Sequence, residues 1–147
     1  MKTYTPPMSG KEVDSIWKNV GLSVSDGALL VSKIDEGLEG AVATRIVKWA
    51  AISQAELRRM TGIPSTTFSR NIKTRFSPDQ SERLVRFIRV MDKAVELFDG
   101  DKLAAQKWLN EPSRALAWKT PADLLASEAG AYEVMKLITR IEHGIYS

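Results

Sequence analysis

Cysteine is absent from this chain of 147 residues, and histidine occurs only once, as His143. Without thiols the chain has no disulfide, no thiolate nucleophile and no cysteine-ligated zinc, and one histidine cannot complete an ordinary structural zinc site. The sequence also contains no glycine-rich phosphate loop and no pair of acids that spacing forces together. We therefore expect a protein without enzymatic activity, metal or cofactor. His143, which follows Glu142, is expected to partner the dipole at a helix end rather than to catalyse.

Long apolar runs are missing as well. No segment approaches the roughly 18 residues that a membrane span needs, and the initial MKTYTPPMSGKEV lacks the apolar core of a secretory signal. The lack of cysteine agrees with a reducing compartment. These features predict a soluble cytoplasmic protein. Residues 1–8, with Pro6 and Pro7 and little to bury, are expected to form a flexible tail.

Apolar and polar residues nowhere alternate with a period of two over a useful length, so the sequence predicts an all-α fold of about eight helices. Residues 9–76 are expected to form a helical N-terminal region. Its first helix has a possible cap at residues 9–12 and ends at Gly21, the second runs from about 25 to 37, and the third covers 41–50. The residues expected on the buried sides of the second and third helices are Leu29, Leu30, Ile34, Val42, Ile46 and Trp49.

The segment 53–72, SQAELRRMTGIPSTTFSRNI, predicts two short helices joined by a tight turn, which is the shape of a helix-turn-helix motif. Ser53 and Glu56 form a capping box that begins the first helix at Gln54. Gly62 ends that helix, because glycine adopts the left-handed conformation at little steric cost. A small residue usually follows the position of Leu57 in such motifs. Here it is Arg58, whose stem can lie along the junction while its guanidinium stays exposed.

The second helix of the motif, from Ser65 to about Lys73, has two unlike faces. Phe68 and Ile72 lie four residues apart and share the apolar face. The other face carries short hydroxyl side chains and cations, which suit phosphate oxygens and base edges. The candidate DNA-binding residues are Ser65, Thr66, Thr67, Ser69, Arg70, Lys73 and Arg75.

Positive charge is concentrated around this motif. The net charge of the chain is only +3, but residues 45–89 contain 10 lysines and arginines against 3 acids. Acids outnumber bases in the segments before and after. A local excess of this kind attracts the phosphate backbone of nucleic acid, although an ordinary solvated helix face is an alternative explanation.

Residues 77–147 are expected to form a long helix and a small C-terminal domain. Ser77, Pro78 and Gln80 give the clearest helix start in the chain, and an apolar stripe then continues to Gly100. This helix suits a spine between two subregions, and its stripe is also suited to a dimer face. Further helices are expected over 101–109, from 120 toward 130 and over 131–142. The connector 113–119 carries Leu116 and Trp118, which we expect to pack.

From residue 108 the chain reads WLNEPSRALAWKTPADLLASEAGAYEVMKLITRIEHGIYS. This pattern resembles the C-terminal domain of the MbcA/ParS/Xre family of type II antitoxins. The residues that carry the resemblance are Trp108, Leu109, Pro112, Ala115, Leu116, Thr120, Pro121, Asp123, Leu124, Leu125, Gly130, Val134, Ile138, Ile141 and Gly144. The likeness continues upstream through Leu57, Gly62, Ser77, Glu82, Ala94 and Phe98.

The resemblance implies an antitoxin of a RES-Xre pair, encoded beside a RES-domain toxin that consumes NAD. Such an antitoxin would bind operator DNA through a Cro-like helix-turn-helix, repress its own operon and form a homodimer. It would bind the toxin through the C-terminal domain, whose end obstructs the active-site cleft. The toxin-binding residues implied are Arg140, Glu142, His143, Gly144, Ile145, Tyr146 and Ser147.

Two alternatives stay open at this point. Ile145 and Tyr146 can instead close the hydrophobic core. A free-standing transcription regulator would explain the helix-turn-helix, but it would leave the C-terminal pattern without an explanation.

Overall fold

The computed structural model describes residues 15–144. Over this range the chain forms nine α-helices and a short 3-10 helix, and no strand beyond one isolated β-bridge, so the predicted all-α fold is confirmed. The predicted tail, the cap at residues 9–12 and the segment 145–147 lie outside the described residues. No helix of the described range is both long and apolar enough to cross a membrane.

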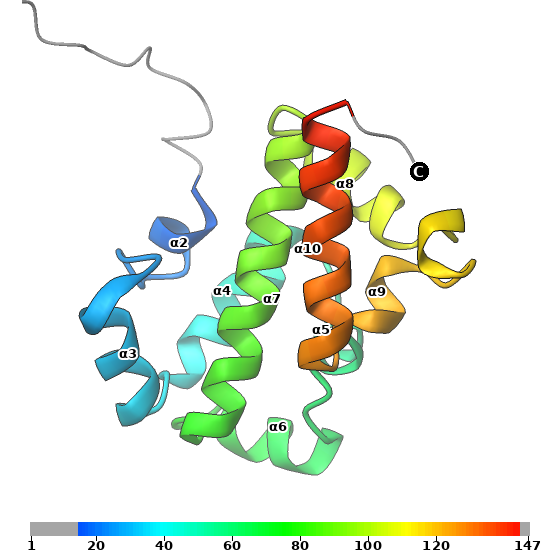
Figure 1. Ribbon diagram of the computed structural model, residues 1–147. Coiled ribbons are helices and arrows are strands. Elements are labelled where there is room, and N and C mark those ends of the chain that lie inside the picture. The colour runs from blue at the N-terminus through cyan, green and yellow to red at the C-terminus, as the bar shows by residue number, and fades with distance from the viewer. Residues whose placement is uncertain (1–14, 145–147) are drawn as a thin grey trace, which may run out of the picture.

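Helix α7 (Pro78–Leu97) runs through the centre of the molecule, with α3 (Gly27–Glu36) on one side and α10 (Glu128–Glu142) on the other (Figure 1). The short α2 (Ile16–Asn19) and helices α5 (Gln54–Thr61) and α8 (Lys102–Leu109) also pack against it. The inward stripe of α7 is buried at Leu84, Phe87, Ile88, Met91 and Val95. The stripe is therefore buried within one chain, and the alternative that it forms a dimer face is wrong.

Side-chain caps determine where several helices begin. The Ser53 hydroxyl accepts from the amide of Glu56 at 3.0 Å, and the Glu56 carboxylate accepts from the Ser53 amide at 3.2 Å. Ser77 and Gln80 form the same reciprocal pair at the start of α7, where Pro78 occupies the first helical position. Each pair satisfies amides that have no partner inside the helix, and both predicted starts are confirmed.

The start of α4 (Gly40–Ala50) is joined to the loop that follows α6 (Ser65–Asn71). The amide of Gly40 donates to the Thr74 carbonyl and that of Phe76 to the Leu38 carbonyl, both at 2.9 Å. The buried Ser81 hydroxyl of α7 accepts from the amide of Leu38 at 2.7 Å. A side chain on Gly40 would overlap the carbonyl of Ile72, so only glycine permits this approach. These contacts fix α6 relative to α4.

Three predictions about individual residues are wrong. Leu29 lies on the outer side of α3 and is 57% exposed, while Leu30 is buried. Trp118 is 67% exposed although its neighbour Leu116 packs inside. Gly130 does not end a helix, because it lies in the first turn of α10, where a side chain would overlap the carbonyl of Leu124.

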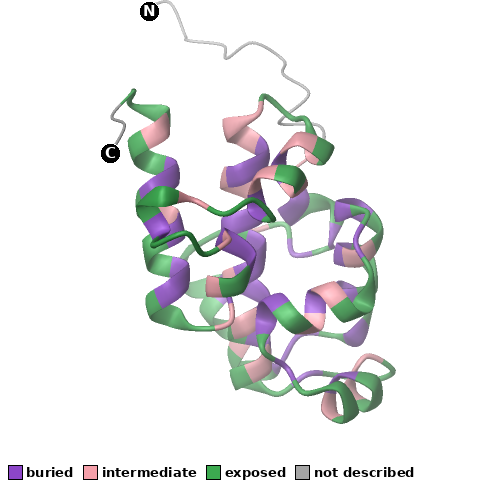
Figure 2. Ribbon diagram, turned by 90° about the vertical axis from the view of Figure 1, so that its right-hand side faces the viewer, coloured by how far each residue is buried: buried purple, intermediate pink, exposed green. Residues whose placement is uncertain are grey.

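Most helix boundaries shift by only a few residues from those expected. Helix α9 (Pro121–Leu124) is a single turn, α6 ends at Asn71, and α7 ends at Leu97 rather than near Gly100. The buried residues of these helices face one continuous core, with exposed residues on the outside (Figure 2).

Candidate nucleic-acid interface and C-terminal surface

Helices α5 and α6 form the predicted helix-turn-helix. Gly62 has φ +73° and ends α5 in the left-handed conformation, and Ile63 then turns back into the core. Phe68 of α6 is fully buried and its ring lies 5.6 Å from that of Phe76, centroid to centroid. Burying two aromatic rings here holds α6 against the start of α7.

Arg58 lies at the junction between the two helices of the motif. Its side chain is half-buried, and its guanidinium carbon lies 5.8 Å from the centre of the Phe68 ring. A cation over an aromatic face is attracted to the negative face of the ring. Arg58 therefore packs on α6 and fills the junction, as the sequence predicts for its long stem.

The outer face of α6 is open. Ser65, Thr66, Ser69 and Arg70 are exposed, and Thr67 is half-buried. Because α6 ends at Asn71, the other two candidates, Lys73 and Arg75, lie on the loop after the helix, and both are exposed. The surface predicted to meet DNA thus consists of one helix face and the loop that follows it.

A surface hollow of about 520 Å³ lies between this loop and the first turns of α4. It contains three cationic side chains, from Arg45, Lys73 and Arg75, with the hydroxyl residues Thr44 and Thr74 and the single acid Glu39. Arg45 is not among the candidates that the sequence predicts. Its position as an exposed cation at the border of the buried face of α4, next to Ile46 in the sequence, is the signal that could have identified it.

Four of the arginines in the basic segment are engaged within the protein. Arg59 pairs with Asp123 at 2.9 Å, Arg83 with Asp79 at 3.2 Å and Arg86 with Glu128 at 3.1 Å. Arg75 donates to the carbonyl of Gly37 and lies 3.7 Å from Glu39. The local positive field is therefore smaller than the residue count suggests. Within residues 15–144, the exposed cations of this segment that form no ion pair are Arg45, Lys48, Arg70, Lys73 and Arg89.

The second candidate surface lies at the end of α10. Arg140, Glu142, His143 and Gly144 are exposed there, and α10 ends at the opposite end of the molecule from α6 (Figure 1). The remaining candidates, Ile145, Tyr146 and Ser147, lie outside the described residues. The two candidate surfaces therefore do not overlap within one chain.

Two family models match consecutive parts of the chain. Residues 29–89 match the antitoxin Xre-like helix-turn-helix domain, which includes α5 and α6. Residues 93–144 match the antitoxin Xre/MbcA/ParS C-terminal toxin-binding domain, which includes α8, α9 and α10. The two matches assign the helix-turn-helix and the end of α10 to different parts of the chain.

Two curated relatives are similar over their entire length. One is an Antitoxin Xre from Yersinia enterocolitica, with 44% identity over 100% of both chains. Another is an Antitoxin Xre from Photorhabdus laumondii, with 40% identity over 100% of both chains. Similarity at this level extends across both candidate surfaces and the helix between them.

Proposed function

Because this chain belongs to the Xre/MbcA/ParS family of antitoxins, with a helix-turn-helix domain followed by a toxin-binding domain, we propose that it neutralises a RES-domain toxin and represses its own operon. The toxin is proposed to degrade NAD, and the pair to be a type II system, in which the antitoxin acts as a bound protein. The observation that supports the proposal is that α6 and the end of α10, the two candidate surfaces, lie at opposite ends of one molecule (Figure 1). One chain can then hold DNA and toxin at the same time.

For DNA binding we propose that α6 enters the major groove with its hydroxyl face toward the bases. Arg70 and Lys73 are exposed, form no ion pair within the described range and lie three residues apart, so both can contact phosphates. Arg45 in the adjoining hollow extends this contact onto α4. The chain is proposed to act as a homodimer, because helix-turn-helix proteins commonly read two half-sites related by a two-fold axis.

For toxin binding we propose that the chain beyond α10 enters the active-site cleft. Gly144 has φ +70° and turns the backbone away from the helix axis after Glu142. Beyond it the sequence supplies one aromatic residue, Tyr146, and Arg140 in the last turn supplies a cation. An aromatic ring and a cation are the groups expected to fill a pocket built for a dinucleotide.

The test uses the protein encoded by the reading frame next to this gene. We expect a RES-domain protein that co-purifies with the full chain and that consumes NAD only when the chain is absent. NAD consumption is followed in the purified toxin as the chain is added. If the neighbouring product neither binds the chain nor loses activity, the antitoxin proposal is wrong, and DNA binding alone would then indicate a free-standing regulator.

A further inference from the structure

The segment 113–119, here called the Trp118 loop, exposes the bulkiest apolar surface of the described chain. It follows α8, includes the 3-10 helix η1 (Arg114–Leu116) and leads into α9. Trp118 is 67% exposed, which is unusual because the large apolar surface of tryptophan is stabilising when it is removed from water. The loop is nonetheless well ordered by its backbone. The Trp118 amide donates to the Ser113 carbonyl at 2.8 Å, and the Ser113 amide donates to the Lys119 carbonyl at 3.0 Å.

The backbone of the loop is strained at Ala117 and Trp118. Ala117 has φ +56° and Trp118 has φ +66°, and two consecutive residues with side chains rarely occupy this left-handed region. The strain is held in place because Leu116 is buried in the core and η1 packs against α10. Residues kept in unfavourable backbone conformations without a packing role for their side chains tend to occur at binding sites.

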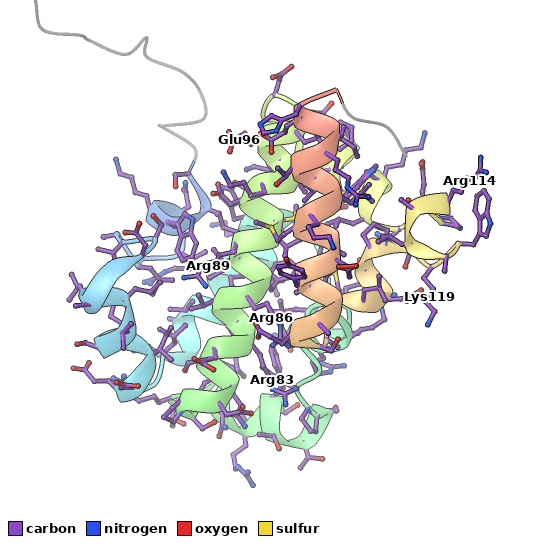
Figure 3. All side chains as sticks on the ribbon, viewed as in Figure 1. Arg83, Arg86, Arg89, Glu96, Arg114 and Lys119 are labelled. Carbon is purple, nitrogen blue, oxygen red and sulfur yellow. The ribbon has the colours of Figure 1, made fainter. Side chains whose placement is uncertain are left out.

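The Trp118 loop carries two cations. Arg114 and Lys119 are exposed, project from the same edge of the molecule (Figure 3), and form no ion pair with any residue between 15 and 144. Tryptophan and arginine are the residues most enriched among those that dominate protein–protein binding energy. Uncompensated lysine and arginine beside them favour a partner surface that carries carboxylates.

We propose that the Trp118 loop is a second contact for the toxin, separate from the end of α10. Its ring would enter a recess on the toxin that is lined by apolar side chains and bordered by carboxylates. Three observations favour the toxin as the occupant. The loop lies inside residues 93–144, which match a toxin-binding domain. It packs against α10, whose end is the other proposed toxin contact. The loop carries two cations and no acid. The inference rests on the proposed function.

The experiment measures binding of the full chain to the purified product of the neighbouring reading frame by titration calorimetry. Trp118→Gly removes the ring and also relieves the left-handed strain, so its thermal unfolding midpoint should be no lower than that of the unsubstituted chain. Removal of a central tryptophan should weaken binding roughly 30-fold. Leu103→Ala is the matched control, because Leu103 is an apolar residue of the same domain that is 73% exposed. This control should bind within about twofold of the unsubstituted chain.

A second variant tests the charges independently of the ring. Arg114→Ala combined with Lys119→Ala should lower the association rate at low salt and reduce its dependence on ionic strength.

Equal binding by Trp118→Gly and the unsubstituted chain would overturn the loop contact and leave the antitoxin proposal intact. A lowered unfolding midpoint for Trp118→Gly would indicate a structural role instead. If Trp118→Gly changes the oligomeric mass of the protein but leaves its affinity for the toxin unchanged, the loop contacts a second copy of this chain instead. Failure of the unsubstituted chain to bind would overturn both proposals.

Discussion

Arg59 in α5 donates to the carboxylate of Asp123 in α9 at 2.9 Å, although 64 residues separate them in the sequence. The same guanidinium donates to the side-chain oxygen of Asn110 at 3.1 Å. The helix-turn-helix and the C-terminal part are thereby joined at their surfaces as well as through α7. A second arginine, Arg86, makes the deeper link, because it donates to the backbone carbonyls of Leu125 and Ala126 from α7.

These two arginines should differ in their contribution to stability. Arg59 and Asp123 are 45% and 53% exposed, so Arg59→Ala should lower the free energy of unfolding by at most about 1 kcal/mol. The side chain of Arg86 is only 15% exposed, and its removal leaves two part-buried carbonyls without their donors. Arg86→Ala should therefore cost about 2 kcal/mol, measured by urea unfolding.

Glu128→Gln separates the ion pair of Arg86 from its backbone bonds. The Glu128 side chain is 89% exposed, so neutralising it should change stability by less than about 0.5 kcal/mol. A destabilisation by Glu128→Gln as large as that by Arg86→Ala would show that the charge pair, and not the two carbonyl bonds, is the source of the effect.

Gly40→Ala and Gly130→Ala should both destabilise the protein. Inside an ordinary helix, alanine is favoured over glycine by about 1 kcal/mol. Here the added methyl group overlaps the carbonyl of Ile72 or Leu124, and neither backbone can yield without moving a neighbouring helix end. Overpacking of this kind costs about 1–3 kcal/mol, so each substitution should lower the free energy of unfolding rather than raise it. A rise in the thermal unfolding midpoint of either variant would contradict the close approach described for that glycine.

Arg70→Ala combined with Lys73→Ala should weaken binding to DNA from upstream of the gene and flatten its salt dependence. Removing one phosphate contact should reduce the slope of log affinity against log salt by about 0.9. Fluorescence anisotropy with a labelled duplex at several salt concentrations measures both the affinity and the slope. An unchanged slope in this variant would mean that the DNA surface lies elsewhere.

Arg45→Ala tests whether the hollow beside α6 belongs to the DNA contact. The slope should fall by about 0.9, the value expected for a single phosphate. Lys48→Ala is the matched control, because Lys48 is an exposed cation one turn further along α4 that does not line the hollow. Equal effects of Arg45→Ala and Lys48→Ala would point to a general charge effect, and the hollow would then have no special role.

Deletion of Ile145–Ser147 should weaken protection from the toxin without unfolding the protein. The buried residues of α10 end at Ile138, and the helix itself ends at Glu142. Toxin binding and inhibition of NAD consumption measure the effect, and circular dichroism checks that the helical content is retained. If inhibition persists unchanged, the end of the chain does not obstruct the cleft.

Local chemistry makes much of the fold predictable from the sequence. A cap such as Ser53 with Glu56 acts within three residues, so its partners are adjacent in the sequence as well as in space. The same holds for Ser77 with Gln80, and for Gly62, whose left-handed conformation ends α5. The apolar spacing on α4 and α7 identifies their buried sides for the same reason.

The remaining features depend on contacts that no local pattern records. The sequence places Gly130 between two expected helices, but this glycine lies inside α10 and is needed for a close approach to Leu124, which is a property of two helices packed together. The apolar character of Trp118 predicts burial, yet the hydrogen bonds of its loop turn it outward. The count of cations cannot show that Arg86 is held by residues about 40 positions further on.

The two family matches end and begin at residues 89 and 93, and both positions lie inside α7. Val90 and Met91 at this junction are buried, and the same helix packs against α3 and α5 as well as against α8 and α10. A gene fusion or recombination event at this point would join part of one parent's inward surface to part of another's. Exchange between diverged relatives at this point would therefore require matched replacements along α7, because the two family matches share this helix.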